Sequence, residues 1–351
     1  MSALPSIDAA PAAREYPGRK CALRLEPLPD GRHRITVRPH PGQAVQHRTW
    51  VTSYPVELIL QFFATKDLSL VDEIRREEDP GYVEHKVRTE VLAYLSPPEF
   101  AGKRILDFGC GSGASPLVLS RVLPPCEIVG VELEAKLLEL ARSRARHFGR
   151  ESLTLLQSPS GDSLPPGLGE FDFIMFNAVF EHLLPHERRT LLPLVWSHLR
   201  PGGVLFLNQT PYRWSPVETH TTRGLPLINY LPDSATLWVA RRYCKRIAPD
   251  ESWESLLRRG IRGGTVPEIM GIIGGAARAQ LLRPRPEVGD RVDLWFKSLS
   301  PRHAALKRSL WMSLKLGKAL SGREITPTLS LAIRKVASAS SQPLESPPTR
   351  P

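Results

Sequence analysis

The fold of this chain is decided by the stretch Ile105-Leu106-Asp107-Phe108-Gly109-Cys110-Gly111-Ser112-Gly113-Ala114-Ser115. Its apolar start is typical of a short buried strand, and its glycines permit a tight turn into a helix whose first N–H groups are free. A strand, a glycine turn and a helix in this order predict a site for the polar part of a nucleotide-like ligand. The next strand, 127–131, leads to Glu132. A carboxylate in this position can accept hydrogen bonds from ribose hydroxyls.

Strand and helix patterns alternate on both sides of this stretch. Such alternation predicts the α/β class, with a doubly wound, mostly parallel sheet and helices on both faces. Beyond residue 210 the pattern loosens into helical segments before a final strand at 329–335. The predicted strands are 104–108, 127–131, 153–156, 171–176 and 204–208, and the predicted helices are 115–122, 134–148 and 187–199.

Composition excludes several classes of protein. With four cysteines in 351 residues, the chain is not a disulfide-stapled module, and no apolar run is long enough to span a membrane. The first residues lack a secretory signal, so we expect a cytosolic protein. The net charge of +11 is uneven, because residues 235–351 hold 21 Lys/Arg and 9 Asp/Glu, a net +12. This excess fits either a contact with an anionic partner or a solvated face.

The glycine stretch resembles motif I of the class I S-adenosylmethionine (SAM)-dependent methyltransferases, in which an Asp precedes Gly-x-Gly-x-Gly. The relaxed dinucleotide fingerprint of nicotinamide and flavin enzymes fits as well, with Ala114 in its last position. Later segments favour the methyltransferases, because four of them resemble segments of that family and follow one another in the family's order. Residues 161–165 resemble the segment that contacts adenine, and residues 171–177 resemble the fourth strand. Residues 178–183 resemble the loop after that strand, and residues 199–205 resemble the turn into the fifth strand.

The resemblance implies a set of residues that bind SAM. Asp107 would place the methionine part, the glycine turn would pass close to it, Glu132 would hold the ribose, and Asn177 would face the methyl donor at the fourth-strand tip. Asp162 would contact adenine, although Ser158 follows the strand more directly and is the alternative. The turn residues assigned to the cofactor are Gly109, Cys110, Gly111 and Gly113.

Composition and apolar pattern along the chain suggest the domain organisation. The helices before the glycine stretch would form an N-terminal cap, and a C-terminal helical insertion would lie on the substrate side. The predicted parts are a loosely ordered arm at 1–50 with one hairpin around 21–37, a helical cap at 51–100, a SAM-dependent methyltransferase domain at 101–337 with insertions at about 211–265 and 287–325, and a disordered tail at 338–351.

Candidate catalytic residues lie in two loops that should meet above the carboxyl ends of the strands. A hydroxyl acceptor must lose a proton, and His or Glu near the strand tips can take it. Glu181 and His182 follow the fourth strand, and His220 follows the fifth. We therefore assign catalytic roles to His220, His182 and Glu181. The competing interpretation is that Glu-His-Leu only shapes this loop, since many methyltransferases act by proximity alone.

These side chains, with His186 and Glu218, are also of metal-ligand type. The small-RNA 2′-O-methyltransferases bind a divalent metal through a Glu-x-x-Glu-His run and a later His. Here Ala178 occupies the first Glu position. The pattern is incomplete, and we expect no metal.

The sequence as a whole predicts a SAM-dependent methyltransferase acting on a small-molecule or saccharide acceptor, lipid-linked or free, at a hydroxyl. The alternatives are an RNA methyltransferase that uses the basic C-terminal third, and a SAM-binding protein without catalysis. Nucleic acid is not expected as a partner, because no RNA-binding module with stacked aromatic residues is present. Arg302–Leu320 forms a basic amphipathic pattern, which fits peripheral contact with an anionic membrane or an ordinary packing helix. The oligomeric state is left open.

Overall fold

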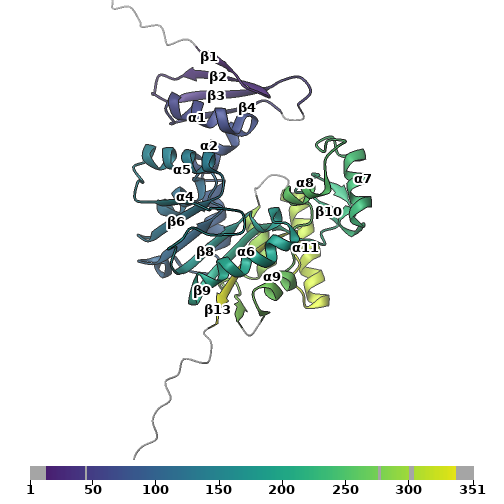
Figure 1. Cartoon of the computed structure of the whole chain (residues 1–351). Helices are drawn as coiled ribbons and strands as arrows, with labels where there is room; N and C mark the ends of the chain where they lie inside the picture. Colours follow the sequence, from purple (N-terminus) through teal and green to yellow (C-terminus); the bar gives the residue numbers. More distant parts are fainter. Residues whose placement is uncertain (1–12, 44–45, 276–277, 300–303, 337–351) are drawn as a thin grey trace, which may run out of the picture.

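A seven-stranded sheet forms the centre of the computed structural model, which describes residues 13–43, 46–275, 278–299 and 304–336 (Figure 1). Strands β5 to β9 are parallel to one another, and β13 runs antiparallel to both β9 and β12. The predicted doubly wound, mostly parallel sheet is confirmed. In sheet order the strands are β12 (Ala279–Leu281), β13 (Thr328–Lys335), β9 (Leu199–Pro211), β8 (Phe171–Asn177), β5 (Arg104–Phe108), β6 (Glu127–Glu132) and β7 (Thr154–Gln157).

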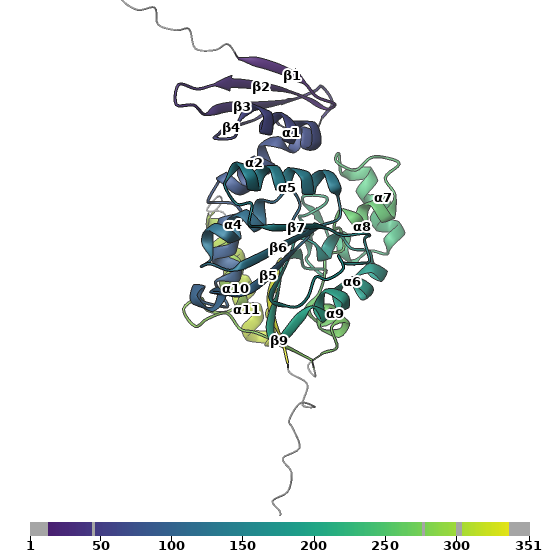
Figure 2. The ribbon, with the colours of Figure 1, turned by 60° about the vertical axis from the view of Figure 1, so that its left-hand side comes forward.

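Helices cover both faces of this sheet, because successive side chains of each buried strand point to opposite faces. Ile105 belongs to one apolar cluster and Leu106 to another. Figure 2 shows α4 and α10 on one side of the sheet and α6 and α9 on the other. The covering elements are η2 (Val87–Val91), α4 (Ala114–Val122) and α10 (Arg291–Ser298) on the first face, and α6 (Pro185–Ser197) and α9 (Val266–Ile272) on the second, while α5 (Ala135–His147) packs on β6 and β7.

The N-terminal region forms a four-stranded antiparallel sheet, which corrects the predicted loosely ordered arm. Every second side chain of its central strands is buried, including Cys21, Leu23 and Ile35. The predicted hairpin around 21–37 is present, with Cys21–Pro27 antiparallel to His33–Pro39, and two helices cover its buried face to form a separate small core. Its elements are β1 (Arg14–Pro17), β2 (Cys21–Pro27), β3 (His33–Pro39), β4 (Arg48–Thr52), α1 (Val56–Lys66), η1 (Asp67–Ser69) and α2 (Leu70–Glu78).

A buried arginine joins this small core to the glycine turn. Arg144 of α5 is fully buried and donates to the Tyr54 hydroxyl at 2.7 Å and to the Ser112 backbone oxygen at 2.8 Å. Its guanidinium also lies 4.6 Å from the centre of the Phe62 ring. A buried charge is tolerated only with such partners. The short elements α3 (Val83–Lys86) and η3 (Pro97–Phe100) complete the chain between α2 and β5.

After β9 the chain forms a small apolar cluster of its own around Ile228 and Leu256. Lys315 and Lys318 of the last helix are paired with Asp290 at 2.7 and 2.6 Å, so part of the basic excess serves the fold. Residues 1–12 and 44–45 of the predicted arm, 276–277, 300–303 and 337 of the predicted domain, and the predicted tail at 338–351 lie outside the described residues. The remaining elements are η4 (Phe180–His182), β10 (Val217–Glu218), β11 (Leu225–Pro226), η5 (Ile228–Tyr230), α7 (Asp233–Tyr243), α8 (Trp253–Arg258) and α11 (Ala304–Ser321).

Within the described part of the chain, no helix has the length and apolar character needed to cross a membrane.

Candidate active site

The glycine turn connects β5 to α4 with three left-handed glycines. The φ angles of Gly109, Gly111 and Gly113 are +74°, +56° and +84°, a region that residues with a side chain rarely adopt. At Gly113 a Cβ would also lie 2.8 Å from the Cα of Ala141 in α5. The turn is therefore held tightly against the neighbouring helix, as close backbone packing requires.

Asp107 lies at the end of β5 and lines a cavity of about 180 Å³ together with Gly111, Asn177 and Asn208. It is 2% exposed, and its Oδ2 has no hydrogen-bond partner among the described residues. Burial raises the pKa of this carboxyl to about 7, although a hydrogen bond from Ser115 opposes the shift. A buried carboxylate without a partner is costly unless a cation meets it. The site therefore fits the ammonium of an amino-acid moiety.

Glu132 lines a second cavity, of about 380 Å³, on the other flank of the turn. Its Oε2 accepts from the Gly111 N–H at 2.8 Å, and its Oε1 accepts from the N–H groups of Leu133 and Glu134 at 2.8 and 2.9 Å. These bonds hold the carboxylate at the carboxyl end of β6, which is the position expected for a ribose contact. Gly109 and Ala178 line both cavities, so the two lie on either side of one turn.

The structure places Ser158, and not Asp162, in the second cavity. Ser158 is 4% exposed and follows the last residue of β7. Asp162 is exposed and accepts from the Ser160 hydroxyl at 2.6 Å. Because β7 ends at Gln157, Asp162 lies in the turn beyond the sheet edge, and of the two predicted alternatives Ser158 is the one that lines this cavity.

Two further residues from the predicted set line the first cavity. Cys110 is 5% exposed, and burial raises the pKa of its thiol. Asn177 Oδ1 accepts from Asn208 Nδ2 at 3.1 Å, which orients both amides where β8 ends beside β9.

Charged residues from the N-terminal helices form a wall of the first cavity that sequence reasoning missed. Glu73 accepts from the Ser112 hydroxyl at 2.6 Å and lies 3.7 Å from Lys66 Nζ. Glu90 is 2% exposed, pairs with Lys86 at 2.9 Å and has an unpartnered Oε2; burial raises its pKa. The helical pattern of this region was visible in the sequence, but no local signal indicated that it lies against the glycine turn.

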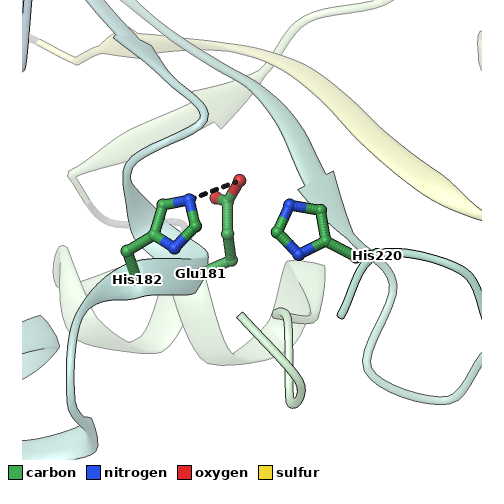
Figure 3. Close-up of side chains that lie close together, drawn as sticks. All are labelled: Glu181, His182 and His220. Atoms are coloured by element: carbon green, nitrogen blue, oxygen red, sulfur yellow. Dashed lines mark ion pairs between the residues drawn. The ribbon is translucent and has the colours of Figure 1, made fainter. Parts of the chain in front are cut away.

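Glu181, His182 and His220 come together beside this site, as Figure 3 shows. Glu181 lies on η4, directly after β8, and is fully buried. Its Oε2 accepts from the Thr210 hydroxyl at 3.0 Å, while its Oε1 has no hydrogen-bond partner among the described residues and lies 3.8 Å from His182 Nε2. Burial raises the pKa of Glu181 against the opposing effect of the two histidines. The imidazole centres are 5.5 Å apart.

Backbone oxygens determine which ring nitrogen carries the hydrogen in both imidazoles. His182 Nδ1 lies 2.8 Å from the Arg258 oxygen, and His220 Nδ1 lies 3.0 Å from the Arg259 oxygen. Since a carbonyl oxygen can only accept, both Nδ1 atoms carry the hydrogen, and in neutral histidine each Nε2 then keeps a free lone pair. Both Nε2 atoms face the carboxylate of Glu181 in Figure 3.

Glu218 and His186 do not join this cluster. The Glu218 carboxylate accepts from the N–H groups of His220 at 2.9 Å and of Thr222 at 2.5 Å, so it closes the turn that carries His220. His186 is exposed near the start of α6. Gly260 was not among the predicted residues. It allows the loop after α8 to approach His220, because a Cβ at this position would lie 2.8 Å from His220 Nδ1.

Comparison with known proteins identifies the central segment. A family model described as a methyltransferase domain matches residues 105–203. The carboxy-S-adenosyl-L-methionine synthase of Campylobacter curvus is 26% identical over 143 residues, which is 40% of this chain and 58% of the relative. The ribosomal protein L11 methyltransferase of Dechloromonas aromatica is 34% identical over 134 residues, 37% of this chain and 41% of the relative. Among solved structures, the SAM-bound amino pentose methyltransferase of Micromonospora echinaspora has a TM-score of 0.31 at 26% identity, covering 39% of this chain and 55% of that one.

The family match, together with the fold and the glycine turn, identifies residues 105–203 as a methyltransferase domain of the class I SAM-dependent type. SAM is the cofactor of this class. The chain spans only 41% and 58% of the lengths of the two curated relatives, and the relatives differ in the reactions that their names describe.

Proposed function

We propose that the chain transfers a methyl group from SAM to a hydroxyl of a small-molecule or saccharide acceptor. The observation that carries this proposal is the arrangement of two cavities on either side of one glycine turn. The first contains the unpartnered Oδ2 of Asp107, and the second contains Glu132 and Ser158. This arrangement supports an amino-acid moiety on one flank and a nucleoside on the other, both parts of one ligand.

The chain's own residues have three tasks in this proposal. Asp107 binds the ammonium, and Glu132 binds the ribose hydroxyls in place of part of its present backbone contacts. The N-terminal helices cover the first cavity and reduce its access to water. When bound, SAM supplies a methyl carbon on a sulfonium, and its transfer to the acceptor oxygen leaves S-adenosylhomocysteine while the hydroxyl proton is lost.

The cluster of Glu181, His182 and His220 supports a hydroxyl acceptor. His182 lines the second cavity together with Gly109 and Glu132, so the cluster adjoins the proposed cofactor. Two imidazoles with Nε2 toward a buried carboxylate are suited to holding an alcohol and drawing its proton away. An acceptor that is already nucleophilic would not need them.

The proposal is tested first by calorimetry with S-adenosylhomocysteine. We expect one site per chain, and Glu132→Ala should weaken binding at least about tenfold because it removes the ribose contact, the equivalent of about 1.4 kcal/mol. Glu134→Ala, next to it but outside the cavity, is the matched control. Absence of binding at millimolar S-adenosylhomocysteine would contradict a SAM-dependent activity.

The acceptor is tested with methyl-labelled SAM and a panel of hydroxy acids, sugars and phenols. Label should enter an oxygen-linked methyl group, and His220→Ala should lower turnover much more than it lowers cofactor affinity. Label found on nitrogen or carbon would exclude the hydroxyl acceptor while leaving the cofactor assignment intact.

A further inference from the structure

We propose that Glu181, His182 and His220 bind a divalent transition-metal ion of the Zn²⁺ type. The set offers two imidazole nitrogens and one carboxylate oxygen. Three protein ligands with an open position are typical of catalytic zinc, and His₂Glu is one of the known donor sets. Mg²⁺ and Ca²⁺ prefer oxygen ligands alone, so the two imidazoles favour a transition metal.

The ligand atoms are close enough to surround one ion. They all lie within 4.8 Å of one another, and His182 Nε2 is 3.8 Å from Glu181 Oε1. Zinc holds nitrogen and oxygen at about 2.0–2.2 Å, so two ligands of one ion are about 3–4 Å apart. His220 is exposed and His182 is 42% exposed. Small rotations of these two imidazoles are enough to close the set around an ion.

The unpartnered oxygen of Glu181 is an independent sign of a missing cation. Its side chain is 0% exposed, and Oε1 accepts no hydrogen bond from any described residue. No Lys or Arg of the described ranges pairs with this carboxylate; its one ion-pair contact is with His182. A buried carboxylate without a cationic partner is strongly disfavoured, and a metal ion between the imidazoles supplies the missing charge.

The surroundings of the histidines are those of metal ligands. A metal-bound histidine usually donates its second N–H to a carbonyl or carboxylate, which fixes the ring and leaves the other nitrogen for the metal. Here two consecutive carbonyls, of Arg258 and Arg259, receive the two Nδ1–H groups. The end of α8 that carries them is itself held in place, because the Arg258 guanidinium binds Glu187 through two contacts of 2.5 and 2.6 Å.

The open position adjoins the proposed cofactor cavity, since His182 lines that cavity. Resting on the proposed function, we infer that the metal holds the acceptor oxygen beside the methyl donor. Ala178 supplies no fourth ligand, which was the reason to expect no metal from the sequence. Three converging ligands make that fourth ligand unnecessary, because a substrate oxygen or water can complete the coordination.

The experiment uses the full chain, freed of any affinity tag and of metal by dialysis against a chelator. Zn²⁺ is titrated by calorimetry, and the metal bound after desalting is counted by elemental analysis. We expect one Zn²⁺ per chain. His182→Ala and His220→Ala should each weaken binding at least tenfold, whereas His186→Ala, an exposed histidine outside the cluster, should bind as the native chain does.

Two further measurements keep the outcome unambiguous. Because Glu181 is buried, Glu181→Gln is examined by circular dichroism, and the exposed histidine variants carry the test if it fails to fold. Substitution by Co²⁺ should give ligand-field absorption that both histidine variants lose. Failure to bind Zn²⁺, or equal loss of binding in His186→Ala, would overturn the inference.

Titration of S-adenosylhomocysteine into the metal-free chain separates this inference from the proposed function. Cofactor binding without Zn²⁺ binding refutes the metal site alone. Zn²⁺ binding without cofactor binding refutes the proposed function and the role of the metal in it, but not the metal site.

Discussion

Two alanine variants in the glycine turn should separate packing from ligand binding. Gly111 and Gly113 both have left-handed backbones, with φ of +56° and +84°. A Cβ at position 113 would lie 2.8 Å from the Cα and the Cβ of Ala141. A Cβ at position 111 meets no atom within 4 Å, although Gly111 lines the first cavity. Gly113→Ala should therefore damage the fold, and Gly111→Ala should damage the site.

The magnitudes follow from two terms. A left-handed alanine costs about 1–2 kcal/mol, offset by about 0.4–1 kcal/mol because alanine restricts the unfolded chain. Gly111→Ala should then lower the free energy of unfolding by at most about 1.6 kcal/mol. Gly113→Ala adds the overlap with α5, whose backbone must move, and overpacking of this kind costs about 1–3 kcal/mol. The second variant should thus be less stable than the first by about 1–3 kcal/mol.

Urea unfolding of both variants measures this difference as a shift of the midpoint at unchanged slope. In parallel, calorimetry with S-adenosylhomocysteine should show that Gly111→Ala binds at least about tenfold more weakly than the native chain, the equivalent of about 1.4 kcal/mol. Equal midpoints for the two variants would refute the reasoning, because they would mean that α5 yields to the added methyl at no cost. Native affinity in Gly111→Ala would show that the turn does not approach the ligand.

Three other predictions concern the cofactor and the last helix. The pKa of Asp107 is raised to about 7. Since a cationic ligand prefers the ionised carboxylate, the affinity for S-adenosylhomocysteine should rise with pH up to about 7 and then level off. The variant Asp107→Asn should show no such dependence on pH. Calorimetry should show weaker binding in Ser158→Ala and native binding in Asp162→Ala; the reverse order would restore the original assignment. If α11 contacts anionic membranes, the chain should float with anionic vesicles at low salt, and Leu316→Glu, at a position 62% exposed, should abolish this; a chain that stays unbound at every salt concentration would contradict the membrane interpretation.

Much of the central fold could be predicted because its signals are local. The strand before Gly109, the glycine turn and the apolar period of α5 each lie within a few consecutive residues, and right-handed crossovers then limit the topology. In the N-terminal sheet only the hairpin around 21–37 was predicted, which β2 and β3 form; the outer strands were missed because β1 and β4 are short and lie in a region rich in arginine and proline. The alternate residues Cys21, Leu23 and Leu25 become a buried face only when α1 and α2 cover them.

The candidate site divides in the same way. Motif spacing led to the proposals for Asp107, Glu132 and Asn177, since each lies in the last two residues of a strand. It could not distinguish Ser158 from Asp162, because the end of β7 at Gln157 determines which residue stays at the sheet edge. Nor could it place Glu73 of α2 against the turn, a contact between residues 39 positions apart.

By itself, the sequence determined the class of protein, the type of cofactor and the strand ends that we propose to bind it, because hydrophobic period and glycine conformation act between near neighbours. Only the tertiary structure decided that Glu181 is buried with an unpartnered oxygen and that His182 and His220 face it. It also decided that the carbonyls after α8 fix both tautomers. These features depend on desolvation and on contacts between distant segments. Neither desolvation nor long-range contact can be predicted from the local pattern of residues.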